Sequence, residues 1–220
     1  MSETVSRKRG RKASLSKPII LDAAQALIEK NGVGALSMRK LAARLGVEAM
    51  SLYYHVSSKD ELVDAVVDRL VQKIEPPAPS GDWKADIRTI AADFRAVAVR
   101  SPNVATILLS RQVFTTGVLS LTDAVLAALQ QAGLDTERSV YAARAILSYV
   151  MGALLREVHP DATASNNKSE KMDRHAETIA MTTLPHVAAA APQLLRRAGE
   201  PEYRFGLDLL LDAIEVQAAR

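Results

Sequence analysis

The segment Ser37–His55 constrains the fold of this chain more than any other. It reads SMRKLAARLGVEAMSLYYH, in which two short helix-forming stretches, Ser37–Leu45 and Glu48–Tyr54, flank a glycine at position 46. Apolar residues recur on one face of each stretch, so the two helices can pack against each other. A short glycine-containing turn between two such helices is typical of a helix-turn-helix, whose second helix enters the DNA major groove. The segment therefore predicts a unit that reads DNA.

The charge distribution supports this interpretation. Residues 1–60 hold 11 Lys and Arg against 5 Asp and Glu, whereas the other 160 residues hold 17 against 20. A basic head on a mildly acidic body suits a phosphate-facing module attached to a part with another task. Residues 1–16 include the run RKRGRK and have the composition of a disordered basic tail. Such a tail either follows the DNA backbone, enters the minor groove or is merely solvated.

Composition also disfavours several classes of protein. There is no cysteine, so a disulfide framework and a thiolate metal site are excluded, and the four histidines have no ligand spacing. The chain carries none of the common hydrolase, zinc-peptidase or phosphate-loop motifs. No apolar run approaches the roughly 18 residues that a membrane span needs. We expect a cytoplasmic protein without catalytic residues, metal, cofactor or membrane contact.

The remaining pattern predicts an all-α protein, with a three-helix helix-turn-helix head and a larger helical body. No stretch alternates with the period of a strand. The sequence PPAPSG at 76–81 marks the boundary, so the expected parts are the tail 1–16, the head 17–75 and the body 82–220. A loop is expected over 159–171, and Pro185 and Pro192 bracket an alanine-rich piece. Helices outside the helix-turn-helix are expected over 17–31, 57–74, 82–100, 101–109, 118–132, 139–158, 172–184 and 201–219.

Two segments resemble the TetR family of bacterial transcriptional regulators. They read AAQALIEKNGVGALSMRKLAARLGV and SLYYHVSSKDEL, and the C-terminal stretch YRFGLDLLLD resembles the tetracycline-repressor type of body. The resemblance implies a homodimeric repressor that binds a palindromic operator and is released by a small-molecule effector bound in the body. Two alternatives stay open, namely an activator and a DNA-binding protein without small-molecule input.

The expected DNA contacts lie on the helix-turn-helix and at the start of the next helix. Arg39 is the best candidate for reading guanine, with a phosphate contact as the alternative. Ala49 and Met50 offer only apolar contacts, so the sequence does not predict the operator. His55 either meets a phosphate or packs against the next helix. The whole set is Ser37, Met38, Arg39, Glu48, Ala49, Met50, Ser51, Tyr53, Tyr54, His55 and Lys59.

A dimer interface is expected on two helices of the body, with an intramolecular core as the alternative. Small residues in 139–156 allow a partner backbone to approach closely, and an apolar seam follows the last helix. The small residues are Ala142, Ala143, Ala145, Ser148, Gly152 and Ala153, and the seam is Leu207, Leu211, Ile214 and Ala218.

The effector is expected to be a small apolar or amphipathic molecule in a pocket of pliable side chains. By the resemblance, the histidines that bind metal in tetracycline repressors fall at Leu108 and near Glu75, so a magnesium–tetracycline ligand is not expected. A core role is the alternative for each pocket residue. The expected lining is Phe94, Leu108, Phe114, Tyr141, Tyr149, Met151, Met172 and Met181.

Overall fold

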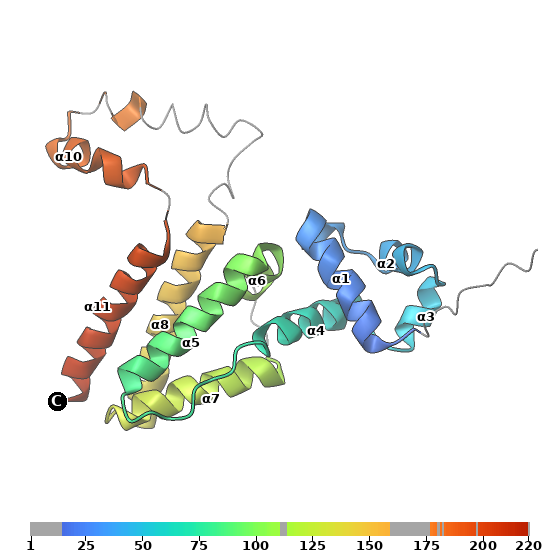
Figure 1. Ribbon diagram of the computed structural model, residues 1–220, viewed down its shortest axis with the longest axis horizontal. Helices are drawn as coiled ribbons and strands as arrows, with labels where there is room; N and C mark the ends of the chain where they lie inside the picture. Colours follow the sequence, from blue (N-terminus) through green and yellow to red (C-terminus); the bar gives the residue numbers. More distant parts are fainter. Residues whose placement is uncertain are drawn as a thin grey trace, which may run out of the picture. The chain divides into compact units, whose positions relative to one another are not determined.

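The computed structural model describes residues 15–110, 114–158, 177–179, 181, 183–196 and 198–219. Over these ranges every regular element is a helix, which confirms the predicted all-α class (Figure 1). The chain divides into two compact units, Met1–Val66 and Val67–Arg220. The division falls within the helix α4 (Lys59–Val71), which continues from one unit into the other.

The N-terminal unit is built on one apolar face of each of its helices. The side chains of Ile20, Leu41 and Leu52, from three different helices, are fully buried. Gly46 ends α2 with φ at 67°, a left-handed conformation that a side chain would disfavour, and this turn leads into α3. The elements before α4 are α1 (Lys17–Asn31), the 3-10 helix η1 (Val33–Ala35), α2 (Met38–Leu45) and α3 (Ala49–Tyr53).

Within its described residues, the C-terminal unit contains the helices predicted over 82–158 and 201–219, and two of them start two or three residues earlier than predicted. The helix α7 begins at Thr116 rather than Val118, because the Thr115 side chain accepts the Val118 N–H and caps it. The helix α8 begins at Thr136 rather than Ser139, and Asp135 accepts the Arg138 N–H at 2.8 Å. The elements are α5 (Trp83–Arg100), α6 (Pro102–Ser110), α7 (Thr116–Gln131), α8 (Thr136–Val158), α10 (Pro185–Leu194) and α11 (Glu200–Ala218).

The helix α10 runs through Pro192 to Leu194, although the sequence predicted that this proline would end the alanine-rich piece. Proline removes the backbone hydrogen bond that its position would donate, and only two residues of the helix follow it. The predicted loop 159–171 lies outside the described residues, as does most of the predicted helix 172–184. Within the latter, residues 177–179 are helical.

The core of the C-terminal unit lies among α5, α7, α8 and α11. Ile87, Leu129, Leu154 and Leu211 are almost fully buried there. The Tyr203 hydroxyl donates to the Ala91 carbonyl at 2.8 Å, and burial raises the pKa of this phenol well above its ordinary value. The hydroxyl therefore stays protonated and joins α11 to α5.

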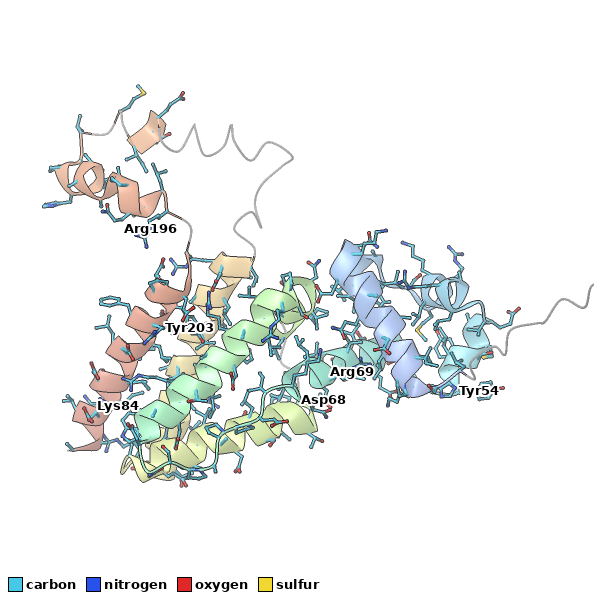
Figure 2. The ribbon with its side chains drawn as sticks, in the orientation of Figure 1. Tyr54, Asp68, Arg69, Lys84, Arg196 and Tyr203 are labelled. Atoms are coloured by element: carbon cyan, nitrogen blue, oxygen red, sulfur yellow. The ribbon has the colours of Figure 1, made fainter. Side chains whose placement is uncertain are left out.

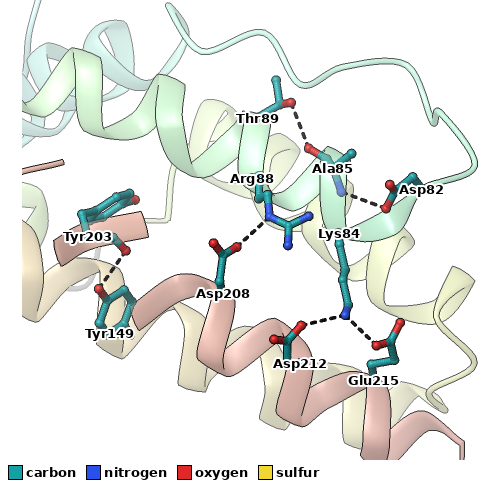
Figure 3. Close-up of polar contacts among 10 residues, drawn as sticks. All are labelled: Asp82, Lys84, Ala85, Arg88, Thr89, Tyr149, Tyr203, Asp208, Asp212 and Glu215. Carbon is teal, nitrogen blue, oxygen red and sulfur yellow. Dashed lines mark hydrogen bonds and ion pairs between the residues drawn. The ribbon is translucent and has the colours of Figure 1, made fainter. Parts of the chain in front are cut away.

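Ion pairs line the contact between α5 and α11 (Figure 3). Lys84 Nζ lies 2.9 Å from Asp212 Oδ1 and 2.7 Å from Glu215 Oε2. Arg88 Nε lies 2.7 Å from Asp208 Oδ1. Figure 3 also shows the Tyr149 hydroxyl of α8 donating to the Tyr203 carbonyl at 2.8 Å. Three helices are thus joined by polar contacts around the apolar core.

The predicted apolar seam on the last helix is part of this core. Leu207, Leu211 and Ile214 are at most 9% exposed, so the intramolecular alternative holds for them. Ala142, Ala143 and Ala218 also pack against the core, and Ala153 belongs to it. Only Ala145, Ser148 and Gly152 of the predicted small residues remain exposed on α8. The prediction of a dimer seam was wrong for the buried residues Leu207, Leu211 and Ile214, because this face of α11 packs within its own unit.

Candidate DNA-binding interface

The first helix of the helix-turn-helix presents basic side chains to solvent. Its N-cap is Ser37, whose hydroxyl accepts the Lys40 N–H at 3.2 Å. Arg39 and Lys40 are exposed in the first turn of α2. Met38 is only 8% exposed, so its side chain belongs to the core and leaves only its backbone for a DNA contact. The exposed Arg39 and Lys40, at the positive end of the α2 dipole, can therefore contact a DNA phosphate or a guanine base.

The second helix exposes an apolar and aromatic surface. Met50 is 68% exposed and Tyr54 is 85% exposed, while Leu52 between them is fully buried. Figure 2 labels Tyr54 at the end of this helix. Glu48 and Tyr53 are also exposed, and Ala49, Ser51 and His55 are half-buried. The structure thus brings these predicted contacts onto α3 and its ends.

The start of α4 is fixed by hydrogen bonds to Glu61. The Ser58 hydroxyl accepts the Glu61 N–H at 3.0 Å and so caps the helix. The Glu61 carboxylate in turn accepts the Ser57 N–H and hydroxyl, each at 2.6 Å. It also lies 3.7 Å from Lys17 Nζ on α1. This network sets the backbone around Lys59, which is exposed at the N-terminus of α4.

We predict that Glu61→Gln destabilises the protein more at neutral pH than in acid. The hydrogen bonds from Ser57, and then the charge of Lys17, hold the pKa of Glu61 below its ordinary value of 4.5. A lowered folded-state pKa adds stability above the unfolded pKa and loses it as the pH falls through the folded value. Urea unfolding at pH 7 and at pH 3 measures the loss of stability, which should be smaller at pH 3 than at pH 7.

The control is Glu48→Gln, because Glu48 precedes α3 and its side chain makes no capping hydrogen bond. Its effect on unfolding should be small at both pH values. An equal loss from Glu61→Gln at pH 3 and pH 7 would contradict the role given to this carboxylate.

The predicted effector residues lie in different environments. Phe114, Tyr141 and Met181 are 77%, 56% and 85% exposed. Phe94 and Tyr149 instead pack against the core of the C-terminal unit. Leu108 and Met151 are half-buried, and Met172 lies outside the described residues. The structure therefore does not support a single pocket lined by all eight, since exposed and core-packed side chains cannot share one enclosed cavity.

A hollow of about 480 Å³ lies elsewhere, between α5 and α11. Its lining includes Ala92, Ala96 and Leu207 together with charged residues of both signs, such as Arg88 and Asp208. Of the predicted pocket residues that the structure describes, none lines it. The sequence did not predict the charged residues that line this hollow. The ion pairs that join α5 to α11 link residues more than 100 positions apart, and no local pattern indicates such pairs.

The described ranges contain neither a candidate metal cluster nor a candidate membrane span. No three His, Cys, Asp or Glu side chains there are grouped so as to hold a metal ion. Among those residues, no helix is both long enough and apolar enough to span a membrane.

Two family profiles match this chain. The profile described as "Bacterial regulatory proteins, tetR family" matches residues 20–66, which contain the helix-turn-helix. The profile described as "Tetracyclin repressor-like, C-terminal domain" matches residues 75–218. Together they cover both compact units.

Individual proteins give the same result. An HTH-type transcriptional regulator of Saccharopolyspora erythraea is 36% identical over 155 residues, which are 68% of this chain and 66% of that protein. The HTH-type transcriptional repressor DrrR1 of Streptomyces coeruleorubidus is 27% identical over 96% of this chain and 82% of its own length. The crystal structure of the Streptomyces coelicolor protein ActR with actinorhodin has a TM-score of 0.82 at 22% identity, covering 94% of this chain and 100% of ActR. This chain belongs to the TetR family of DNA-binding transcriptional regulators, with a tetracycline-repressor-like C-terminal domain.

Proposed function

We propose that this protein is a homodimeric repressor that binds a palindromic operator and leaves it when a small molecule binds the body. The observation that carries the proposal is the exposed surface of the helix-turn-helix. Arg39 on α2 and Met50 and Tyr54 on α3 are exposed, whereas Leu52 on the same short helix is buried. A recognition helix needs one face that packs against the rest of the domain and another face that contacts DNA bases.

Exposed apolar side chains on two adjacent helices support the homodimer. On α8, Tyr141, Leu147 and Leu155 are 56%, 51% and 42% exposed. On α11, which packs beside α8, Phe205, Leu209 and Val216 are 66%, 56% and 57% exposed. A twofold axis would bury these faces against their copies, and two recognition helices would then read half-sites about 34–36 Å apart.

The effector and the sign of regulation rest on the relatives. The C-terminal profile is named for the tetracycline repressor, and DrrR1 is named a repressor. An activator, or a regulator without small-molecule input, would share the same DNA-binding surface. We do not propose a catalytic activity, because the relatives are transcriptional regulators.

The test is selection of bound duplexes from a random DNA pool by the full-length protein, followed by affinity measurements on the selected duplex. We expect a palindromic site. Arg39→Ala should weaken binding by about 1–3 kcal/mol and relax the preference at one position of each half-site. Arg44→Ala is the matched control, since it removes the same charge from an exposed position of the same helix.

The outcomes separate the alternatives. Failure to enrich any palindrome would contradict the proposal of a dimeric specific regulator. Equal effects of Arg39→Ala and Arg44→Ala on every sequence would show that Arg39 contacts only the backbone. A selected duplex whose affinity rises when an effector is added would favour an activator or a corepressor-dependent protein.

A further inference from the structure

The first residue of α1 lies beside the start of α4. Lys17 Nζ is 3.7 Å from Oε1 of Glu61. The Glu61 side chain folds back toward the residues that precede α4, because its Oε2 accepts both the backbone N–H and the hydroxyl of Ser57 at 2.6 Å. The Lys17 ammonium is therefore held at the N-terminal end of α4, where Lys59 is exposed. All four residues belong to the N-terminal unit.

The Lys17 ammonium keeps its hydrogen-bond donors. A distance of 3.7 Å is too long for an N–H···O hydrogen bond, so the pair with Glu61 is one of charge alone. Within the part of the chain that the structure describes, this ammonium makes no other ion pair or hydrogen bond. The Lys17 side chain is 50% exposed, and an ammonium has three N–H donors. Lys17 is thus available to an acceptor outside the protein.

The carboxylate positions the lysine, and the lysine does not position the carboxylate. The hydrogen bonds from Ser57 are the main cause of the lowered pKa of Glu61, and the charge of Lys17 contributes less. Glu61 is therefore anchored by Ser57 whether or not Lys17 is present. An exposed ion pair of this kind also contributes little to stability. Stability therefore does not explain why a cation is held at this place.

We propose that Lys17 is a further DNA-phosphate contact, positioned by Glu61 next to the place where Lys59 meets DNA. The inference rests on the proposed function and on the DNA contact predicted for Lys59. Each strand of a duplex carries a regular row of phosphate charges, so two neighbouring ammonium groups can meet neighbouring phosphates. Such contacts fix the register of a protein on the duplex and carry no sequence information. Lys17 therefore adds affinity without changing the operator that is read.

The first measurement is the salt dependence of affinity for the duplex selected by the wild type, with full-length protein. Lys17→Gln should weaken binding about three- to tenfold, equally on all sequences, and reduce the salt slope by about 0.9 for each subunit bound. Lys17→Arg keeps the charge and should retain most of the affinity. Lys30→Gln is the matched control, because it removes an exposed lysine from the other end of the same helix. It should leave the slope nearly unchanged.

The second measurement locates the phosphate. Single phosphates of the selected duplex are replaced in turn by uncharged methylphosphonate, and the affinity for each modified duplex is measured. We expect one position at which the replacement weakens the wild type but has little effect on Lys17→Gln, because the partner of that phosphate is already gone. Lys59→Gln should instead become insensitive at a neighbouring phosphate.

The third measurement tests the positioning role of Glu61. In the Glu61→Gln background, Lys17→Gln should have a smaller effect on affinity than in the wild type, because the ammonium is no longer held beside α4. Thermal unfolding accompanies each variant, and Lys17→Gln should unfold close to the wild-type temperature because the pair is exposed.

The outcomes separate this inference from the proposed function. If the wild type selects a duplex but Lys17→Gln matches Lys30→Gln in affinity and salt slope, the phosphate contact is overturned and the proposed function stands. A changed base preference in Lys17→Gln, or wild-type sensitivity at every phosphate, overturns the contact in the same way. An undiminished effect of Lys17→Gln in the Glu61→Gln background overturns the positioning role. If the wild type selects no duplex, the proposed function and the inference both fail.

Discussion

Glu157→Ala is expected to destabilise the C-terminal unit by about 3 kcal/mol. The Glu157 carboxylate forms two hydrogen bonds with Arg95, at 2.6 Å to Nη2 and 2.9 Å to Nε. The side chains of Glu157 and Arg95 are only 13% and 20% exposed, and the hydrogen bonds that Arg95 donates to Glu157 raise the pKa of Arg95. Without Glu157 this cation keeps Glu200 at 3.4 Å as its remaining carboxylate neighbour. Urea unfolding at a fixed protein concentration measures the loss, since a dimer's stability depends on concentration.

The control is the neighbouring residue on the same helix. Arg156 Nη2 lies 2.6 Å from Glu202 Oε1, but these two side chains are 63% and 50% exposed. Arg156→Ala should therefore cost less than about 1 kcal/mol. The double variant Arg95→Met with Glu157→Leu should recover most of the stability, because it removes both charges together. A loss from Glu157→Ala no larger than that from Arg156→Ala would contradict the role given to burial.

The local elements of the fold could be predicted from the sequence because their signals are local. Ser37 as a cap, Gly46 as a turn and the capping pair of Ser58 with Glu61 are each set by residues within four positions. The starts of α7 and α8 were missed because capping by Thr115 and Asp135 was not recognised. A capping residue can start a helix several positions before the first residue of its apolar pattern.

The site in the body could not be predicted in the same way. Leu207 and Leu209 are two positions apart on α11, yet Leu207 is 3% exposed and Leu209 is 56% exposed. Periodicity identifies an apolar face but does not say whether the covering surface comes from the same chain or from a partner. The Gly117 N–H of α7 donates to Asp68 Oδ1 of α4 across 49 positions of sequence, and no local pattern indicates such a pair.

Leu52→Ala is expected to destabilise the N-terminal unit by about 3 kcal/mol and to abolish measurable binding of the selected duplex at 37 °C. Leu52 is fully buried on a helix of 5 residues, Ala49–Tyr53. Truncation of a buried leucine costs about 2–5 kcal/mol, and a unit as small as Met1–Val66 has little stability to lose. Circular dichroism and fluorescence anisotropy with the labelled duplex measure the two effects.

Met50→Ala, two residues earlier, tests the opposite face of the same helix. Met50 is 68% exposed, so its truncation should change the free energy of unfolding by less than about 0.5 kcal/mol. It should instead alter which base pairs the protein prefers at the centre of each half-site, because an apolar contact such as one with a thymine methyl is lost. If Met50→Ala unfolds the protein, or if Leu52→Ala leaves both stability and binding unchanged, the assignment of the two faces of α3 is wrong. We expect Met50→Ala to change only the sequence preference and Leu52→Ala to change the stability. That pair of results would establish that α3 packs through Leu52 and contacts bases through Met50.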